Sequence, residues 1–179
     1  MKFHRKCVVD TNVPVVSNLI RYPDPDFDID DESVLKCIEA IEYVKENNAL
    51  VLDCDDEIFN QYRENLSKNQ YSNSGAGDLF FMWVRDNRYT FSEDDRVSVS
   101  KEGDTYAEFP KDEKLERFDS SDRIFIAVAN KHKDKPPILQ GTDSKWWGYK
   151  EKLESLGIKI IFLCSEYVEK KYLKKLGGT

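Results

Sequence analysis

The feature that most constrains the fold of this chain is the alternation of short apolar segments with longer segments of helical periodicity. The apolar segments span four or five residues each, at 6–10, 49–52, 138–141 and 159–163. They lack the polar–apolar alternation of a half-exposed strand, so each is expected to be a strand buried on both faces. Buried strands separated by helices predict an α/β fold with a mainly parallel central sheet and helices on both sides.

The segments between these strands carry helical signals. In residues 33–47, Val34, Ile38, Ile41 and Val44 form one apolar stripe, which predicts an amphipathic helix. Further helices are predicted from an N-cap at Asp55 or Asp56 to 66, over 78–86, from Ser120 or Ser121 to about 133, over 145–156, and from 165 onward. Within an insertion at about 70–112, alternating apolar residues between 96 and 109 indicate a small hairpin.

Length and composition narrow the class of protein. A chain of 179 residues fits one domain, and none of its apolar runs approaches the roughly 20 residues that span a membrane. A cytoplasmic protein without membrane contact is therefore expected. The net charge of −7 does not favour a nucleic-acid binder, but all of the excess acid lies in residues 1–89, which leaves room for basic patches in the second half.

Several aspartates fall where strands end or helices begin. Asp10 directly follows the first predicted strand, and Asp143 lies just beyond the strand at 138–141. Asp119 and Asp122 lie around the start of the helix that leads to that strand, where the helix dipole favours anions. Because ligands of parallel sheets bind beyond the carboxyl ends of the strands, these carboxylates are expected to gather along one rim.

A gathering of carboxylates implies a bound cation. Two ionised carboxylates about 5 Å apart repel by roughly 3 kcal/mol at an effective dielectric constant near 20. Oxygen ligands without a neighbouring histidine or cysteine favour Mg²⁺ or Mn²⁺, and such ions assist hydrolysis of phosphodiester bonds. We therefore predict that Asp10, Asp122 and Asp143 bind Mg²⁺ or Mn²⁺. For any one aspartate the competing interpretation is a surface charge or a helix cap.

Three motifs resemble those of the PIN domain family of metal-dependent nucleases. They are VVDTN at 8–12, FDSSDRIFIAVA at 118–129, and ILQGTDSKWW at 138–147 followed by a helix and the strand GIKII. The resemblance implies a three-layer αβα sandwich and endonucleolytic cleavage, most often of single-stranded RNA, as in toxins of toxin–antitoxin pairs, defence effectors and RNA-processing proteins. It implies Asp10, Asp122 and Asp143 as metal ligands, Asp119 as a ligand or its support, and Thr11, Asn12 and Thr142 as supporting residues.

One position departs from the family pattern. The helix after the second strand usually carries a glutamate where this chain has Gln61. Glu57 and Glu64 lie four residues before and three residues after Gln61, on the same helical face. Glu57 is the preferred substitute, because it lies one turn nearer the end of the strand.

Contacts to the substrate are less strongly indicated. Arg123, Lys145 and Lys131 lie near the acidic motifs and are candidates for contacts to phosphate, and Trp146 and Trp147 are candidates for base stacking. Each of them has an ordinary alternative as a solvated charge or a core aromatic residue. The lysines of the last helix, at 170, 171, 174 and 175, are typical of a soluble helix face.

Three classes of function remain open. The first is a PIN-like endoribonuclease with an RNA substrate, for which an antitoxin or other protein partner and a homodimer stay open. The second is a PIN-like binding or scaffold module weakened in catalysis, which Gln61 and the acidic charge balance favour. The third is an aspartate-dependent phosphatase; it ranks last, because the phosphatase pattern needs a second acid where Asn12 stands.

Overall fold

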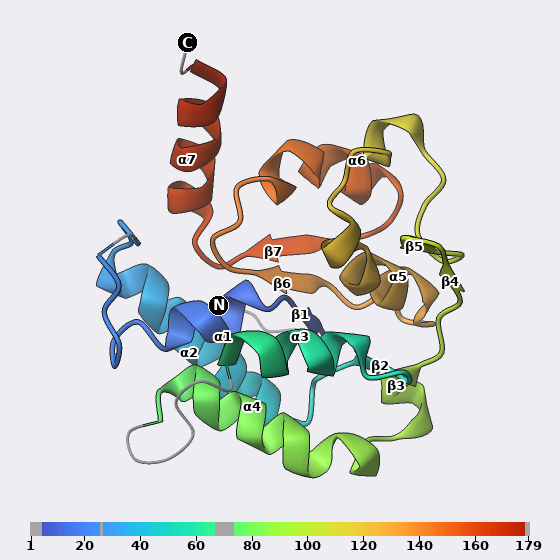
Figure 1. Ribbon diagram of the computed structural model, residues 1–179, viewed down its shortest axis with the longest axis horizontal. Helices are drawn as coiled ribbons and strands as arrows, with labels where there is room; N and C mark the ends of the chain where they lie inside the picture. Colours follow the sequence, from blue (N-terminus) through green and yellow to red (C-terminus); the bar gives the residue numbers. More distant parts are fainter. Residues whose placement is uncertain (1–4, 26, 67–73, 178–179) are drawn as a thin grey trace.

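The computed structural model in Figure 1 describes residues 5–25, 27–66 and 74–177. These ranges form a mixed α/β fold around a small parallel sheet. The start of the predicted insertion, residues 70–73, lies outside the described residues. No helix within the described ranges is long and apolar enough to cross a membrane.

The central sheet consists of β1 (Val8–Val9), β6 (Ile138–Gln140) and β7 (Ile160–Phe162) in the order β1-β6-β7. All pairs are parallel, with Val8 opposite Ile138 and Ile138 opposite Ile160. A bridge between Cys7 and Leu50 adds the segment before β2 (Leu52–Asp53) beside β1. The parallel sheet predicted from the apolar segments is therefore confirmed.

Except for α1, for which no helix was predicted, the α-helices begin and end close to the predicted positions. Their bounds are α1 (Asn12–Ser17), α2 (Asp31–Glu46), α3 (Glu57–Leu66), α4 (Ala76–Asn87), α5 (Arg123–Lys131), α6 (Lys150–Ser155) and α7 (Ser165–Gly177). Short 3₁₀ helices are η2 (Arg88–Thr90), η3 (Glu93–Asp95), η4 (Glu113–Leu115), η5 (Ser120–Asp122) and η6 (Trp146–Tyr149). The predicted helix at 145–156 is thus divided into η6 and α6.

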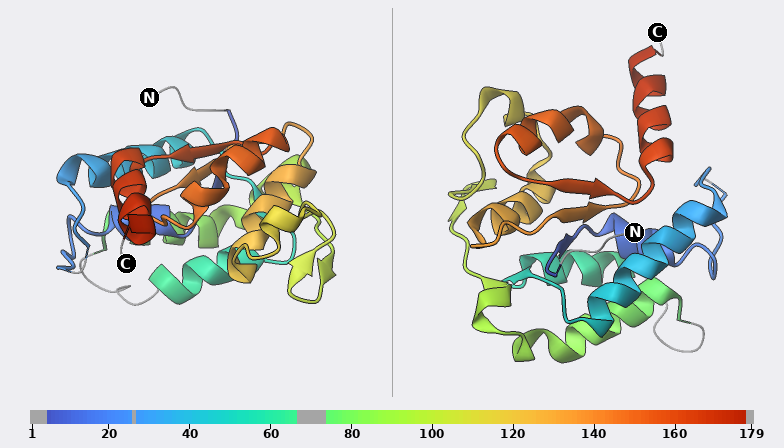
Figure 2. Two further views of the ribbon diagram at one scale, coloured as in Figure 1. Left: turned by 90° about the horizontal axis from the view of Figure 1, so that it is seen from above. Right: turned by 180° about the vertical axis from the view of Figure 1, so that it is seen from behind.

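Packing of these elements follows from where apolar side chains lie. The α5 helix buries a run of six residues from Ile124 to Ala129 and packs against β1, β2 and β6. Helices α1, α2 and α4 contact one another, and α6 contacts β7. Two views agree that α7 extends away from the rest of the molecule (Figure 2). Val168 is its only fully buried residue.

The insertion contains the predicted hairpin in a shorter form. Strands β4 (Lys101–Glu102) and β5 (Thr105–Tyr106) pair antiparallel, and the turn between them places Gly103 at a φ of +63°. The start of the predicted hairpin forms β3 (Arg96–Val97) instead, which pairs parallel with β2. The insertion therefore extends the β2 edge as well as forming its own hairpin.

Asp56 directly precedes α3, as predicted for its N-cap, and its carbonyl accepts a hydrogen bond from Asn60 N–H at 2.8 Å. The side-chain cap, however, comes from another aspartate. Asp53, not Asp55 or Asp56, accepts hydrogen bonds from the first amides of the helix, from Glu57 N–H at 2.8 Å and Ile58 N–H at 2.9 Å. Asp56 has a φ of +61°, and its carboxylate pairs with Arg88 and Arg96. The Asp56 side chain therefore binds arginines of the insertion instead of capping α3.

Candidate functional site

Asp10 directly follows β1 and stays in register with the sheet, since its N–H donates to the Leu139 carbonyl at 2.9 Å. Its side chain is 1 % exposed. One carboxylate oxygen, Oδ1, accepts hydrogen bonds from the backbone N–H and the side-chain amide of Asn12, both at 2.9 Å. The other oxygen has no hydrogen-bond donor among the described residues. The turn after β1 therefore holds a buried carboxylate, one oxygen of which is free to bind a ligand.

Asp122 is the last residue of η5 and immediately precedes α5. Its Oδ2 accepts a hydrogen bond from the Trp146 indole N–H at 3.1 Å, and its Oδ1 accepts one from the Ser121 hydroxyl at 3.4 Å. Trp146 is fully buried in η6. A core tryptophan therefore sets the position of this carboxylate.

Asp143 lies three residues beyond β6. Its N–H donates to Gln140 Oε1 at 3.4 Å, and its Oδ1 accepts from Lys145 N–H at 2.8 Å. Thr142, beside it, is buried. Gly141 allows the two strand ends to meet, because a Cβ there would lie 3.2 Å from the backbone carbonyl of Asn12. The turns that carry Asp10 and Asp143 are thus in contact.

The electrostatics link these three acids. Burial, foremost, and the charges of Asp122 and, less strongly, Asp143 together raise the pKa of Asp10 to about 7, against the hydrogen bonds from Asn12, which lower it. The pKa of Asp122 is raised to about 6, chiefly by burial and also by the charges of Asp143 and Asp119, although the hydrogen bond from Trp146 lowers it. The carboxylates that follow β1 and β6 and the one that precedes α5 are therefore close enough to interact electrostatically.

Asp119, the residue before η5, has different partners from Asp122. Its Oδ2 forms an ion pair with Lys145 Nζ at 3.0 Å, and its Oδ1 accepts a hydrogen bond from the Ser121 hydroxyl at 2.9 Å. These interactions, the Lys145 bond foremost, lower the pKa of Asp119. Asp119 is thus already balanced by a cation, which makes it a support rather than the first choice of ligand.

The Gln61 side chain lies between the turn after β1 and η5. Its side-chain amide donates to the Ser121 carbonyl at 2.7 Å, and its Oε1 accepts from the Thr11 hydroxyl at 3.4 Å. The neighbouring Tyr62 hydroxyl donates to the Val9 carbonyl at 2.5 Å, which docks α3 against β1. A neutral amide therefore joins the turn after β1 to η5.

Glu57 is not brought together with the aspartates. Its carboxylate forms an ion pair with Lys101 of the hairpin at 2.7 Å. Glu64 is exposed. Helical spacing correctly placed both glutamates near the face of Gln61, but it contained no information about the hairpin lysine that binds Glu57.

Two of the expected substrate contacts have structural roles instead. The Arg123 guanidinium donates to the carbonyls of Glu116 at 2.8 Å and Phe118 at 3.1 Å, and it lies over the Phe109 ring. Trp146 is fully buried and cannot stack on a base, whereas Trp147 packs edge-on against Phe162. Of the expected basic contacts near the motifs, Lys145 lies among the acids, and Lys131 pairs with Glu108.

A pocket of about 490 Å³ opens beside the acids, between η5, η6 and α7. Asp119, Asp122 and Lys145 line it, together with Tyr172 and Lys175 from α7. Sequence reasoning missed the contribution of α7. The signal in the sequence was helical spacing. Tyr172 and Lys175 follow Val168 at a spacing that places them on its face of α7, and Val168 is the residue of this helix that is buried.

The donor set of the site suits a hard divalent cation. Within the described ranges Asp10 and Asp122 accept hydrogen bonds only from neutral groups, so neither carboxylate forms a direct ion pair. As they stand, no three His, Cys, Asp or Glu side chains among the described residues are close enough to hold one ion. Ligation by Asp10, Asp122 and Asp143 together would require a further approach of these side chains.

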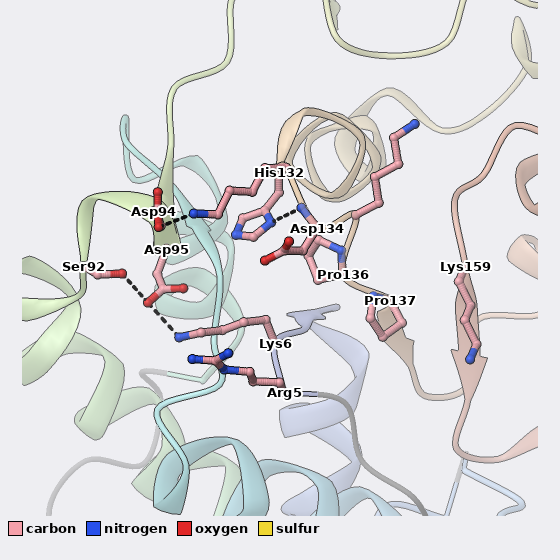
Figure 3. Close-up of a pocket in the computed structure, with 12 residues that line it drawn as sticks. Arg5, Lys6, Ser92, Asp94, Asp95, His132, Asp134, Pro136, Pro137 and Lys159 are labelled. Atoms are coloured by element: carbon pink, nitrogen blue, oxygen red, sulfur yellow. Dashed lines mark hydrogen bonds and ion pairs between the residues drawn. The ribbon is translucent and has the colours of Figure 1, made fainter.

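A larger pocket, of about 910 Å³, lies at the opposite edge of the sheet (Figure 3). Its walls come from the residues before β1, β6 and β7 and from η3. Its charges are of both signs, and two pairs of them form ion pairs, Lys6 with Asp95 and Lys133 with Asp94. The aspartates predicted to be functional are absent from its lining, so this pocket does not belong to the site.

The chain was compared with known protein families, curated proteins and solved structures. No protein-family model matches the chain, and neither curated proteins nor solved structures give a match. The functional argument therefore rests on the site itself.

Proposed function

We propose that this protein is a Mg²⁺- or Mn²⁺-dependent endonuclease with a PIN-like three-layer fold that cleaves single-stranded RNA. The observation that carries the proposal is the convergence of Asp10, Asp122 and Asp143 from three separate elements into one negative field. Burying carboxylates together is unfavourable, and a divalent cation would offset that cost. RNA as the substrate, and a toxin or defence role with a protein partner, rest on the motif resemblance and stay predictions.

The residues present suggest a division of roles. Asp10, Asp122 and Asp143 would hold the metal, which would lower the pKa of an attacking water and offset charge on the phosphoryl oxygens. Asn12 and Trp146 fix the orientation of Asp10 and Asp122 through their hydrogen bonds. Lys145 balances Asp119 and lies where a phosphate would approach the acids.

The test is cleavage of a labelled single-stranded RNA by purified protein with Mg²⁺ or Mn²⁺. Activity is expected to stop with EDTA and to fall at least 100-fold in Asp10→Asn and Asp143→Asn, because each variant removes a charged ligand. Asp104→Asn is the matched control, since Asp104 is exposed in the hairpin. Inactivity of the wild type on RNA and DNA with either metal would refute the proposal, and turnover of small phosphomonoesters alone would indicate a phosphatase.

A binding module without catalysis is the second candidate, and Gln61 favours it. Its amide occupies the place of an expected carboxylate and is held by Thr11 and Ser121. If the protein is a weakened nuclease, Gln61→Glu should raise metal-dependent cleavage, since a fourth carboxylate would strengthen cation binding. RNA binding without cleavage in both the wild type and Gln61→Glu would support the binding module.

A further inference from the structure

The C-terminal helix reaches the acidic site. The Lys175 amine donates to the buried Ser144 hydroxyl at 2.9 Å, and Ser144 follows Asp143 directly. Tyr172 packs against η6 at Gly148, where a Cβ would lie 2.8 Å from the tyrosine hydroxyl. The absence of a side chain at 148 therefore makes room for the Tyr172 ring beside the pocket.

The pocket between α7 and the acids, called the α7 pocket below, has a basic rim. Arg117, Lys145 and Lys175 line it, whereas Asp119 and Asp122 form its acidic side. Lys145 is paired with Asp119. Within the described ranges Arg117 and Lys175 have no ion-pair partner, so both are available to an anionic ligand.

Aromatic rings complete the α7 pocket. Tyr149 and Tyr172 both line it and are both partly exposed. The volume of about 490 Å³ is within the roughly 300–1,000 Å³ of small-ligand sites. Tyrosine rings beside cations are the combination that binds unpaired bases and their phosphates. A base within a duplex is stacked and paired, so it cannot enter such a pocket.

We propose that the α7 pocket binds one unpaired nucleotide of a single-stranded polynucleotide, next to the phosphate presented to the acids. Tyr172 stacks on the base, and Lys175 contacts a phosphate. This inference rests on the proposed nuclease function and adds to it a binding site for one nucleotide of the substrate and a role for α7. It also explains why a chain of net charge −7 can approach a polyanion at this site: the rim cations face the acids.

The test measures binding of a fluorescein-labelled, eight-nucleotide single-stranded RNA by anisotropy, in the Asp10→Asn background to prevent cleavage. Lys175→Gln is compared with Lys174→Gln, which makes the same charge change one residue away, outside the α7 pocket. We expect Lys175→Gln to weaken binding about three- to tenfold and to lower the salt slope by about 0.7. Lys174→Gln should remain within about twofold.

The stacking role is tested with Tyr172→Leu and Tyr172→Phe. Loss of the ring should weaken binding about fivefold or more, whereas the phenylalanine variant should bind like the parent. Circular dichroism and unfolding midpoints check that the variants fold. Single-stranded RNA, single-stranded DNA and duplex RNA of one sequence are compared. Weaker binding of the duplex supports the proposal, and the ratio of RNA to DNA affinity identifies the sugar that is preferred.

The outcomes separate this inference from the nuclease proposal. If the wild type cleaves RNA with metal, but Lys175→Gln and Tyr172→Leu bind like Lys174→Gln, the α7 pocket proposal fails and the nuclease stands. If those variants lose binding and the wild type never cleaves, the α7 pocket is supported and the nuclease fails. Equal binding of duplex and single strands would overturn the α7 pocket proposal.

Discussion

At the scale of single residues, the buried carboxylate of Asp10 is the most unusual group in the site. Its two described hydrogen bonds, both from Asn12, do not offset the burial and the neighbouring acids that raise its pKa to about 7. A buried carboxylate whose surroundings disfavour its charged form is frequently a functional residue, because selection for stability alone would replace it.

This environment predicts a pH dependence of stability in metal-free protein. The folded-state pKa of Asp10, about 7, lies above its ordinary value of 3.8, so the folded state binds more protons between these values. The free energy of unfolding should therefore fall as pH rises from about 4 to 7. Asp10→Asn should remove part of that fall and raise stability at pH 7.5 by about 1–3 kcal/mol, measured by urea unfolding in EDTA.

Asp104→Asn is the control for this prediction. Its free energy of unfolding should depend on pH as that of the wild type does, because Asp104 is exposed. The free energy of unfolding of Asp10→Asn should still fall somewhat as pH rises, since the pKa of Asp122 is also raised, to about 6. Wild type and Asp10→Asn with the same dependence on pH would show that Asp10 is not destabilised by its charge.

At the scale of elements, close contacts between helices hold the turn after β1 in place. The α1 helix begins two residues after Asp10, and it packs against α2 and α4. Gly77 of α4 lies at the contact with α1, where a Cβ would come within 1.8 Å of the Pro14 carbonyl oxygen. Only glycine allows this approach without a shift of one helix.

We predict that Gly77→Ala destabilises the protein by about 2 kcal/mol or more, measured by chemical unfolding. In an open helix, alanine would be more stable than glycine by about 1 kcal/mol, so the overlap with Pro14 must reverse the usual sign. Gly177→Ala, near the end of α7 with no atom within 4 Å of its new Cβ, should change stability by less than about 0.5 kcal/mol. A neutral or stabilising Gly77→Ala would contradict the close α1–α4 packing.

At the scale of the whole molecule, the site depends on segments far apart in the chain. The acids come from residues 10, 122 and 143, Gln61 joins two of their turns, and α7 closes one side through Lys175. A cation held by three of these segments would bind the folded protein and not the unfolded chain. Binding of metal should therefore stabilise the protein as a whole.

The expected result is a rise in the unfolding midpoint with Mn²⁺, followed by differential scanning fluorimetry. At 100 times the dissociation constant the gain is about 2.7 kcal/mol, or about 5–10 °C for a domain of this size. Asp10→Asn and Asp143→Asn should lose most of this shift, and Asp104→Asn should keep it. Equal shifts in all variants would place the ion elsewhere on the protein.

The sequence alone determined the parallel sheet, most of the helices and the positions of the aspartates relative to strand ends. These features depend on residues close together in the chain: Cys7, Val8 and Val9 make a buried strand, and the residue after it must lie at the sheet rim. The capping of α3 by the Asp53 side chain and the pairing of β3 with β2 were not predicted, because each depends on how one element lies against another.

Only the tertiary structure decided which side chains surround the acids. Gln61 lies between Thr11 and Ser121, Glu57 binds Lys101, and Arg123 is held by backbone carbonyls. Lys175 comes from a helix that local pattern assigned to solvent. The physical reason is that periodicity fixes the face of an element on which a residue lies, whereas its partner depends on elements distant in sequence that packing brings to that face.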